Sequence, residues 1–149
     1  MDPETTRPIS VVIVDDHPIL RNGVLRLLQE HSSIDVVGEA ETAEDALLRV
    51  ERLRPDVVLL DIDMPGMGGI EGTRRILERH PETRIVMLSM HAEPGMAKHA
   101  FDAGAMGYVV KTAADAELVT AVTTVASGGR YVNASMGAAL ASPEPASPI

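Results

Sequence analysis

The stretch Asp56-Val57-Val58-Leu59-Leu60-Asp61-Ile62-Asp63-Met64-Pro65-Gly66 decides the fold of this chain. Its apolar run is short and unbroken, and Pro65-Gly66 follows it, which is typical of a strand that is buried on both faces and ends in a turn. Strands of this kind form parallel sheets covered by helices. Asp61 therefore stands at the carboxyl end of a buried strand, where open α/β sheets bind their ligands.

Three further apolar runs also end in polar side chains. Residues 10–14 (SVVIV) lead into Asp15-Asp16, residues 84–88 (RIVML) into Ser89, and residues 106–110 (MGYVV) into Lys111. Residues 34–39 predict one more strand, which carries no such group. Because parallel strands end at the same edge of a sheet, an acid pair, a third acid, a hydroxyl and an ammonium group are expected to meet there.

Segments with helical spacing of apolar residues separate these strands. They are Pro18 to His31, Thr42 to Leu53, Gly69 to His80, Glu93 to Ala103, and a helix capped by Asp115 that runs to Ser127. Thr42 with Asp45 resembles a capping box, and Gly104 is suited to a C-terminal cap. The alternation predicts an α/β fold of the flavodoxin-like (CheY-like) type, a five-stranded parallel sheet in the order 2-1-3-4-5 with five helices. That order makes the first and third strands neighbours.

Composition limits what the chain can be. It has 149 residues, with 45% hydrophobic and 23% charged content, which suits one globular domain. It contains no cysteine, so disulfides, thiol catalysis and zinc–thiolate sites are excluded. The net charge of −9 argues against nucleic-acid binding by this chain itself. No apolar stretch is long enough for a membrane span or a signal peptide, so a cytoplasmic protein without membrane contact is expected.

The predicted domain occupies residues 9–128. Residues 1–8 are expected to be an N-terminal extension, and residues 129–149 a short helix over Asn133 to Leu140 followed by a proline-rich linker. A linker at the end of a chain attaches to nothing. A further domain is therefore inferred to have been removed or to be naturally absent.

The three acids predict a metal site. Carboxylates that share a pocket repel one another unless a cation neutralises them or their pKa values are raised. A set of oxygen ligands favours a hard ion, with Mg²⁺ as the first choice. A carboxylate can also attack a phosphoryl group to form an aspartyl phosphate, for which Lys111 would supply positive charge and Ser89 a hydrogen-bond donor.

Four motifs, taken together, resemble the receiver domain of two-component response regulators over about residues 9 to 128. They are Asp15-Asp16-His17-Pro18, Asp61 within residues 59–69 (LLDIDMPGMGG), Leu88-Ser89, and Gly107-Tyr108-Val109-Val110-Lys111. The resemblance implies that Asp61 accepts a phosphoryl group from a histidine kinase and that the domain catalyses only its own phosphorylation and dephosphorylation. It is not expected to be an enzyme that turns over a substrate.

The resemblance also assigns the other site residues. Asp15 and Asp16 would hold magnesium directly or through water, and the backbone carbonyl of Asp63 would complete the metal site. Ser89 and Lys111 would bind the phosphoryl group, and Ser89 with Tyr108 would form the switch, although an aromatic residue on a terminal strand can also serve packing alone. His17, His91 and His99 have no ligand spacing and are expected to be structural or solvent-facing; of the three, His17 should lie nearest to the acids.

Finer features are similar to the NarL/LuxR-type subfamily. They are His17-Pro18, the turn Met64-Pro65-Gly66-Met67, Ser89-Met90-His91, and Gly128-Gly129-Arg130-Tyr131. The subfamily implies a transcriptional regulator that forms a homodimer on phosphorylation and binds DNA through a helix-turn-helix domain, which this chain lacks.

Two other functions fit part of the pattern. The first is an interaction module that keeps the fold but no longer depends on phosphorylation. The second is a phosphatase of the haloacid-dehalogenase type, in which Asp61 would be the nucleophile and Asp63 the general acid. The phosphatase ranks last, because Pro65 and the preceding Asp15-Asp16 pair do not fit its motif.

Overall fold

Strand β3 (Val57–Asp61) lies at the centre of a five-stranded parallel sheet with the order β2-β1-β3-β4-β5. The computed structural model describes residues 7–141. The other strands are β1 (Ile9–Val14), β2 (Ile34–Ala40), β4 (Arg84–Ser89) and β5 (Gly107–Val110). Every pairing is parallel, as expected for strands joined by helical crossovers. The predicted strand order is confirmed.

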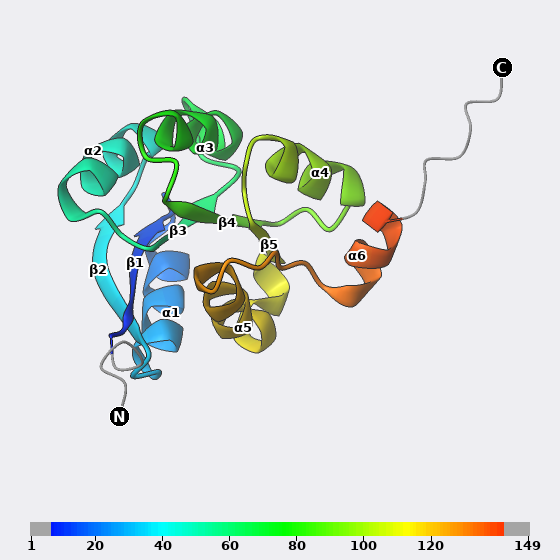
Figure 1. Cartoon of the computed structure of the whole chain (residues 1–149), viewed down its shortest axis with the longest axis horizontal. Helices are drawn as coiled ribbons and strands as arrows, with labels where there is room; N and C mark the ends of the chain where they lie inside the picture. Colours follow the sequence, from blue (N-terminus) through cyan, green and yellow to red (C-terminus); the bar gives the residue numbers. More distant parts are fainter. Residues whose placement is uncertain (1–6, 142–149) are drawn as a thin grey trace, which may run out of the picture.

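Helices cover both faces of this sheet (Figure 1). The helices are α1 (Pro18–Gln29), α2 (Ala43–Leu53), α3 (Gly68–Arg79), α4 (Pro94–Asp102), α5 (Ala114–Ala126) and α6 (Ala134–Ala141), and a 3₁₀ turn over Lys111–Ala113 precedes α5. Helices α1 and α5 lie on one face, and α2, α3 and α4 lie on the other. The described residues thus hold six α-helices, one more than the five assigned to the fold class, because the short C-terminal segment is also helical.

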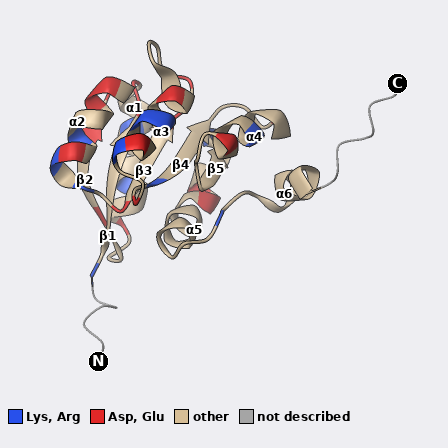
Figure 2. Ribbon diagram, turned by 45° about the horizontal axis from the view of Figure 1, so that its top comes forward, with Lys and Arg blue, Asp and Glu red and all other residues tan. Residues whose placement is uncertain are grey.

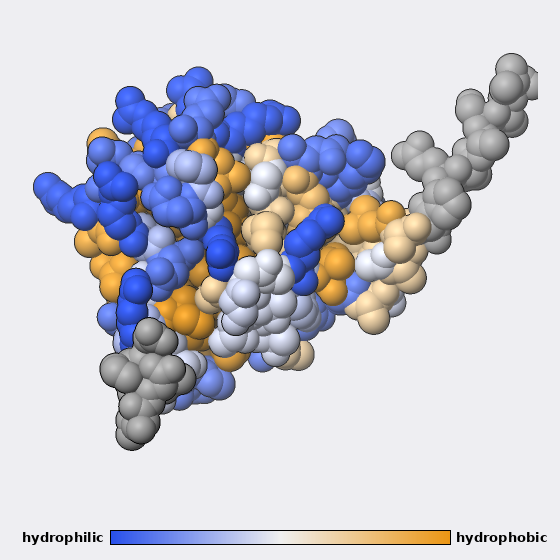
Figure 3. Space-filling view, in the orientation of Figure 1, coloured by the Kyte–Doolittle hydropathy of each residue, from blue (hydrophilic) through white to orange (hydrophobic). Residues whose placement is uncertain are grey.

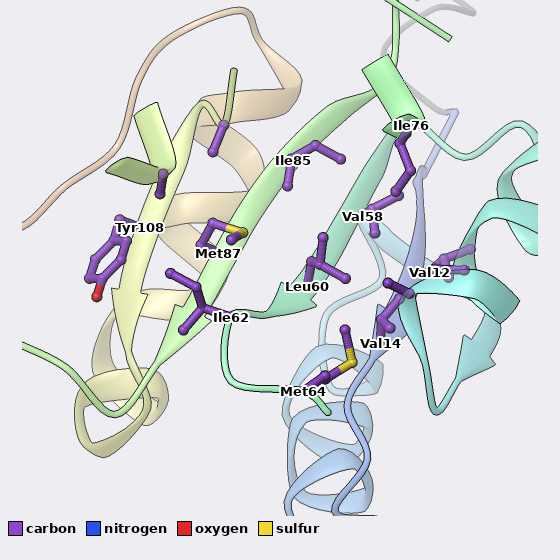
Figure 4. Close-up of a cluster of buried hydrophobic side chains, with 14 of the residues drawn as sticks. Val12, Val14, Val58, Leu60, Ile62, Met64, Ile76, Ile85, Met87 and Tyr108 are labelled. Atoms are coloured by element: carbon purple, nitrogen blue, oxygen red, sulfur yellow. The ribbon is translucent and has the colours of Figure 1, made fainter. Parts of the chain in front are cut away.

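The alternation of side chains along the strands divides the core into two layers. Val12 and Val14 on β1 point toward α2 and α3, together with Leu60 on β3, as the close-up of this layer shows (Figure 4). Val11 and Ile13 point the other way, toward α1 and α5. Strands buried on both faces leave polar groups only at their ends, and this confines the chemistry to the edge of the sheet.

Most helix ends follow from local sequence. The Thr42 hydroxyl accepts a hydrogen bond from the Asp45 N–H at 3.0 Å, as the capping box predicted. Pro18 occupies the first turn of α1, and Gly104, with a φ of +113°, follows α4. The prediction that Asp115 caps this helix is wrong. The 3₁₀ turn continues directly into α5, and Asp115 lies inside the first turn of α5.

Helix α6 packs beside α4 at the end of the chain. Met136 is buried there, and the backbone N–H of Met136 donates a hydrogen bond to the Asn133 side-chain oxygen at 2.9 Å. Charged residues gather on α2 and α3, whereas α6 has none (Figure 2), and its surface is apolar to neutral (Figure 3). The predicted helix is therefore present, although most of the extension over 1–8 and the linker over 142–149 lie outside the described residues.

None of the helices in residues 7–141 is both long and apolar enough to cross a membrane.

Candidate functional site

The strand register brings the predicted site residues to one edge of the sheet. Val14 pairs with Leu60, so Asp15 lies level with Asp61 on the neighbouring strand. Asp61 pairs with Leu88, and Ser89 pairs with Val110, which places Lys111 just beyond the end of β5. All four groups therefore lie at the carboxyl ends of adjacent strands.

Two buried carboxylates share one ammonium group. Asp15 and Asp61 are 1% and 0% exposed, respectively. The Nζ atom of Lys111 lies 3.1 Å from Asp61 Oδ1 and 3.4 Å from Asp15 Oδ2, and its side chain is also buried. One ammonium group offsets one of these negative charges and leaves the other uncompensated. The pair is stabilised here only in part, because buried charges need full pairing.

The two oxygens of Asp61 differ in their surroundings. Oδ1 accepts a hydrogen bond from the Asp63 N–H at 3.0 Å in addition to the contact with Lys111. Oδ2 is buried and has no hydrogen-bond partner among residues 7–141. Burial raises the pKa of Asp61, an effect that the Asp63 N–H and the Lys111 ammonium group oppose and the charge of Asp15 reinforces. A carboxylate held by one oxygen and open at the other can act as a ligand or as a nucleophile.

The start of α3 fixes the position of Asp61. A Cβ atom added to Gly69 would lie 2.6 Å from the Asp61 carbonyl oxygen and 2.7 Å from Ile62 Cα. Only glycine allows the helix to come this close to the end of β3. Gly69 therefore belongs to the support of the site, a role that its sequence position within a Gly-rich turn did not reveal.

The acid cluster suits a divalent cation. Asp15, Asp16, His17 and Asp61 each offer a ligand atom, and these atoms all lie within 4.8 Å of one another. Asp16 Oδ1, like Asp61 Oδ2, is buried and has no hydrogen-bond partner in the described chain. An excess of carboxylate charge and orphaned oxygens are what a bound Mg²⁺ would satisfy. The predicted role of the Asp63 carbonyl stays a prediction.

A chain of hydrogen bonds links Ser89 to Tyr108. The Ser89 hydroxyl oxygen accepts from the His91 N–H at 2.9 Å, and the Tyr108 hydroxyl donates to the His91 carbonyl oxygen at 2.7 Å. Tyr108 is 1% exposed, and burial raises the pKa of its hydroxyl, with Asp63 and Glu93 adding to the effect and Ser89 opposing it. Ser89 and Tyr108, on neighbouring strands, thus contact the same loop residue.

His91 is the residue that sequence reasoning missed. It was assigned no contact with the site, yet its Nε2 lies 3.2 Å from Asp63 Oδ1, across the two loops that follow β3 and β4. The sequence signal that could have predicted this contact is the position of His91 two residues after Ser89, on the loop next to the one that carries Asp63. By contrast, the expected closeness of His17 to the acids is confirmed, with Nδ1 3.3 Å from Asp15 Oδ1 and 3.1 Å from Asp16 Oδ1.

Comparison with known proteins agrees with this geometry. The family described as "Response regulator receiver domain" matches residues 11–123, which is most of the chain. The chain belongs to this family. A crystal structure of a LuxR-family two-component response regulator from Aurantimonas sp. SI85-9A1 is 38% identical to this receiver domain, with a TM-score of 0.86 over 90% of this chain and 96% of that one. The resemblance to NarL/LuxR-type receivers is therefore confirmed.

Curated relatives of this receiver domain are regulators of greater length. The response regulator GacA of Pseudomonas viridiflava is 40% identical over 133 residues, which are 89% of this chain and 62% of GacA. The response regulator UvrY of Escherichia coli K12 is 44% identical over 124 residues, which are 83% of this chain and 57% of UvrY. The chain thus spans about three fifths of the length of these relatives. The family match also sets aside the phosphatase alternative.

Proposed function

We propose that Asp61 is the phosphoacceptor of this receiver domain. The observation that carries the proposal is the asymmetry of its carboxylate, in which Lys111 and the Asp63 N–H hold Oδ1 while the buried Oδ2 has no partner in the described chain. An oriented carboxylate with a free oxygen is suited to attack a phosphoryl group. The domain catalyses only its own phosphorylation and dephosphorylation, and the phosphoryl donor is a histidine kinase.

Asp15 and Asp16 hold Mg²⁺ in this proposal, together with Asp61 and the backbone carbonyl of Asp63. When bound, the ion neutralises charge on the carboxylates and on the transferring phosphoryl group. Lys111, 3.1 Å from Asp61 Oδ1, supplies a second positive charge, and Ser89 donates its hydroxyl hydrogen to a phosphoryl oxygen. Arg21 helps to fix this arrangement, because its guanidinium donates to the Asp15 carbonyl at 2.7 Å.

The switch runs from Ser89 to Tyr108 through the backbone of His91. A phosphoryl group on Asp61 attracts the Ser89 hydroxyl, which then releases the His91 N–H. The loop at His91 moves in response. The Tyr108 hydroxyl, which donates to the His91 carbonyl oxygen, then either moves with that oxygen or gives up the hydrogen bond. Each hydrogen bond contributes about 0.5–1.5 kcal/mol net, so losing or gaining two of them shifts a conformational equilibrium by roughly 5- to 150-fold. Helix α4 begins three residues after His91 and transmits the change.

The output of the whole protein is regulation of transcription. Phosphorylation favours a homodimer, through α1 and α5 or through the α4, β5 and α5 surface. DNA binding belongs to a helix-turn-helix domain outside this chain, in keeping with the net charge of −9 and with the greater length of GacA and UvrY. The protein acts in the cytoplasm, where kinase and DNA are both accessible. Residues 9–128 form the receiver domain, and residues 129–149 connect it to the output domain.

Intact-mass measurement after incubation with acetyl phosphate and Mg²⁺ tests the proposal. The wild-type chain should gain the mass of one phosphoryl group only when Mg²⁺ is present, and Asp61→Asn should gain none. Asp35→Asn is the matched control, because Asp35 is exposed on β2 and should leave labelling unchanged. No gain in the folded wild type would favour a module that works without phosphorylation.

A further inference from the structure

The imidazole of His17, 61% exposed, lies beside the acid cluster, although the metal site proposed above uses only oxygen ligands. Nδ1 lies 3.1 Å from Asp16 Oδ1 and 3.3 Å from Asp15 Oδ1. His17 is the N-cap residue of α1, but its side chain makes no hydrogen bond to the helix. The imidazole is therefore not engaged in capping, and it faces the acids instead.

The distances match those of a metal coordination shell. Zn²⁺ binds imidazole nitrogen and carboxylate oxygen at about 2.0–2.2 Å, which puts neighbouring tetrahedral ligands about 3.3–3.6 Å apart, while right-angled ligands lie about 2.8–3.1 Å apart. The two separations from Nδ1, 3.1 Å and 3.3 Å, fall in this range. Four residues supply ligand atoms within 4.8 Å of one another, which is the number of ligands of a tetrahedral site, and side-chain rotation has to bring together any pair wider than about 3.6 Å.

An independent observation also points to a ligand at this place. Asp61 is 0% exposed, and its Oδ2 has no hydrogen-bond partner among the described residues. Asp16 Oδ1 is likewise without a hydrogen bond there, although His17 Nδ1 is close enough for an ion pair. Lys111 contacts the other oxygen of Asp61, Oδ1, at 3.1 Å, so its ammonium group does not satisfy Oδ2.

We propose that His17 makes this acid cluster a mixed nitrogen and oxygen site that binds a divalent transition ion such as Zn²⁺ in competition with Mg²⁺. Mg²⁺ prefers oxygen ligands alone and gains little from an imidazole, whereas Zn²⁺, Cu²⁺ and Ni²⁺ bind imidazole well and bind most sites more tightly than lighter divalent ions. This inference rests on the proposed function, because it adds a ligand to the same acid site. A transition ion bound there holds Asp61 and withdraws it from phosphorylation.

Titration calorimetry with zinc chloride and, separately, magnesium chloride on the metal-free chain tests the role of His17. Wild type should bind one Zn²⁺ more tightly than Mg²⁺. His17→Ala should weaken Zn²⁺ binding about tenfold or more and Mg²⁺ binding less than about threefold, because only the nitrogen ligand is lost. His31→Ala removes an exposed histidine at the far end of α1 and should change neither affinity. Far-UV circular dichroism checks folding, and His17→Gln replaces the alanine variant if the start of α1 is disturbed.

The inference is overturned if His17→Ala binds Zn²⁺ as tightly as wild type, or if its Zn²⁺ and Mg²⁺ affinities fall by the same factor. Either result would mean that His17 only pairs electrostatically with the acids. Failure of the proposed function has a different signature, in which wild type neither binds Mg²⁺ nor gains a phosphoryl group from acetyl phosphate. A visible absorption band of bound Co²⁺ that loses intensity in His17→Ala would support nitrogen ligation independently of phosphorylation.

Discussion

Replacing Gly69 with alanine tests how the start of α3 supports Asp61. The added Cβ would lie 2.7 Å from Ile62 Cα and 2.6 Å from the Asp61 carbonyl oxygen, and both of these are backbone atoms. Carbon atoms in contact lie about 3.5–4.0 Å apart, so α3 or the end of β3 must shift by about 0.8 Å. Overpacking of this kind costs about 1–3 kcal/mol, more than the 0.5–1 kcal/mol that alanine gains over glycine in a helix.

Gly23→Ala is the matched control. Gly23 lies in the middle of α1, and a Cβ there would have no neighbour within 4 Å among the atoms of the described structure. The substitution should therefore stabilise the protein by about 0.5–1 kcal/mol at position 23, whereas at position 69 an overpacking cost of about 1–3 kcal/mol outweighs the same gain. The gap in stability between the two variants is the overpacking cost itself, about 1–3 kcal/mol, because the shared change in helix propensity cancels.

Urea unfolding followed by far-UV circular dichroism measures both variants, since the chain has no tryptophan for fluorescence. Gly69→Ala should also slow labelling of Asp61 by acetyl phosphate, because the carboxylate moves with its backbone, while Gly23→Ala should label at the wild-type rate. The reasoning fails if Gly69→Ala is as stable as Gly23→Ala. A destabilised Gly69→Ala that labels normally would keep the packing argument and refute the coupling to the site.

Three other predictions concern the site. Lys111→Met should lower the free energy of unfolding, measured by urea titration without metal, by about 3 kcal/mol or more, because it leaves Asp15 and Asp61 buried without their counter-charge. Added Mg²⁺ should restore part of this loss. Burial raises the pKa of Asp61 above 3.8, so the contribution of its protonated form to folding stability is complete below pH 3.8 and is lost as pH rises through the folded-state pKa. The free energy of unfolding of Asp61→Asn, relative to that of wild type, should therefore grow from about pH 4 toward neutrality. A difference between the two proteins that does not change with pH, measured in chelator-treated samples, would contradict this. Tyr108→Phe removes the hydrogen bond to the His91 carbonyl and should lower the free energy of unfolding by about 1 kcal/mol; a variant as stable as wild type would show that the bond contributes nothing measurable.

Local sequence determined the elements and most of their ends. Short apolar runs specified the strands, because strands of a parallel sheet are buried on both faces. Thr42 and Pro18 set two helix starts through bonds and geometry within a few residues. The start of α5 was predicted wrongly at Asp115, because the preceding 3₁₀ turn at Lys111–Ala113 offered no local signal.

The sequence by itself also determined which groups stand at strand ends, and so which chemistry the site can have. Asp15, Asp61, Ser89 and Lys111 were found in this way, because a parallel sheet exposes only its edges. What only the tertiary structure decided are relations between separate elements: the His91–Asp63 pair across two loops, and the close approach of α3 at Gly69 to the end of β3 at Asp61. These depend on how the elements pack against one another, and side-chain patterns within one element carry no information about that.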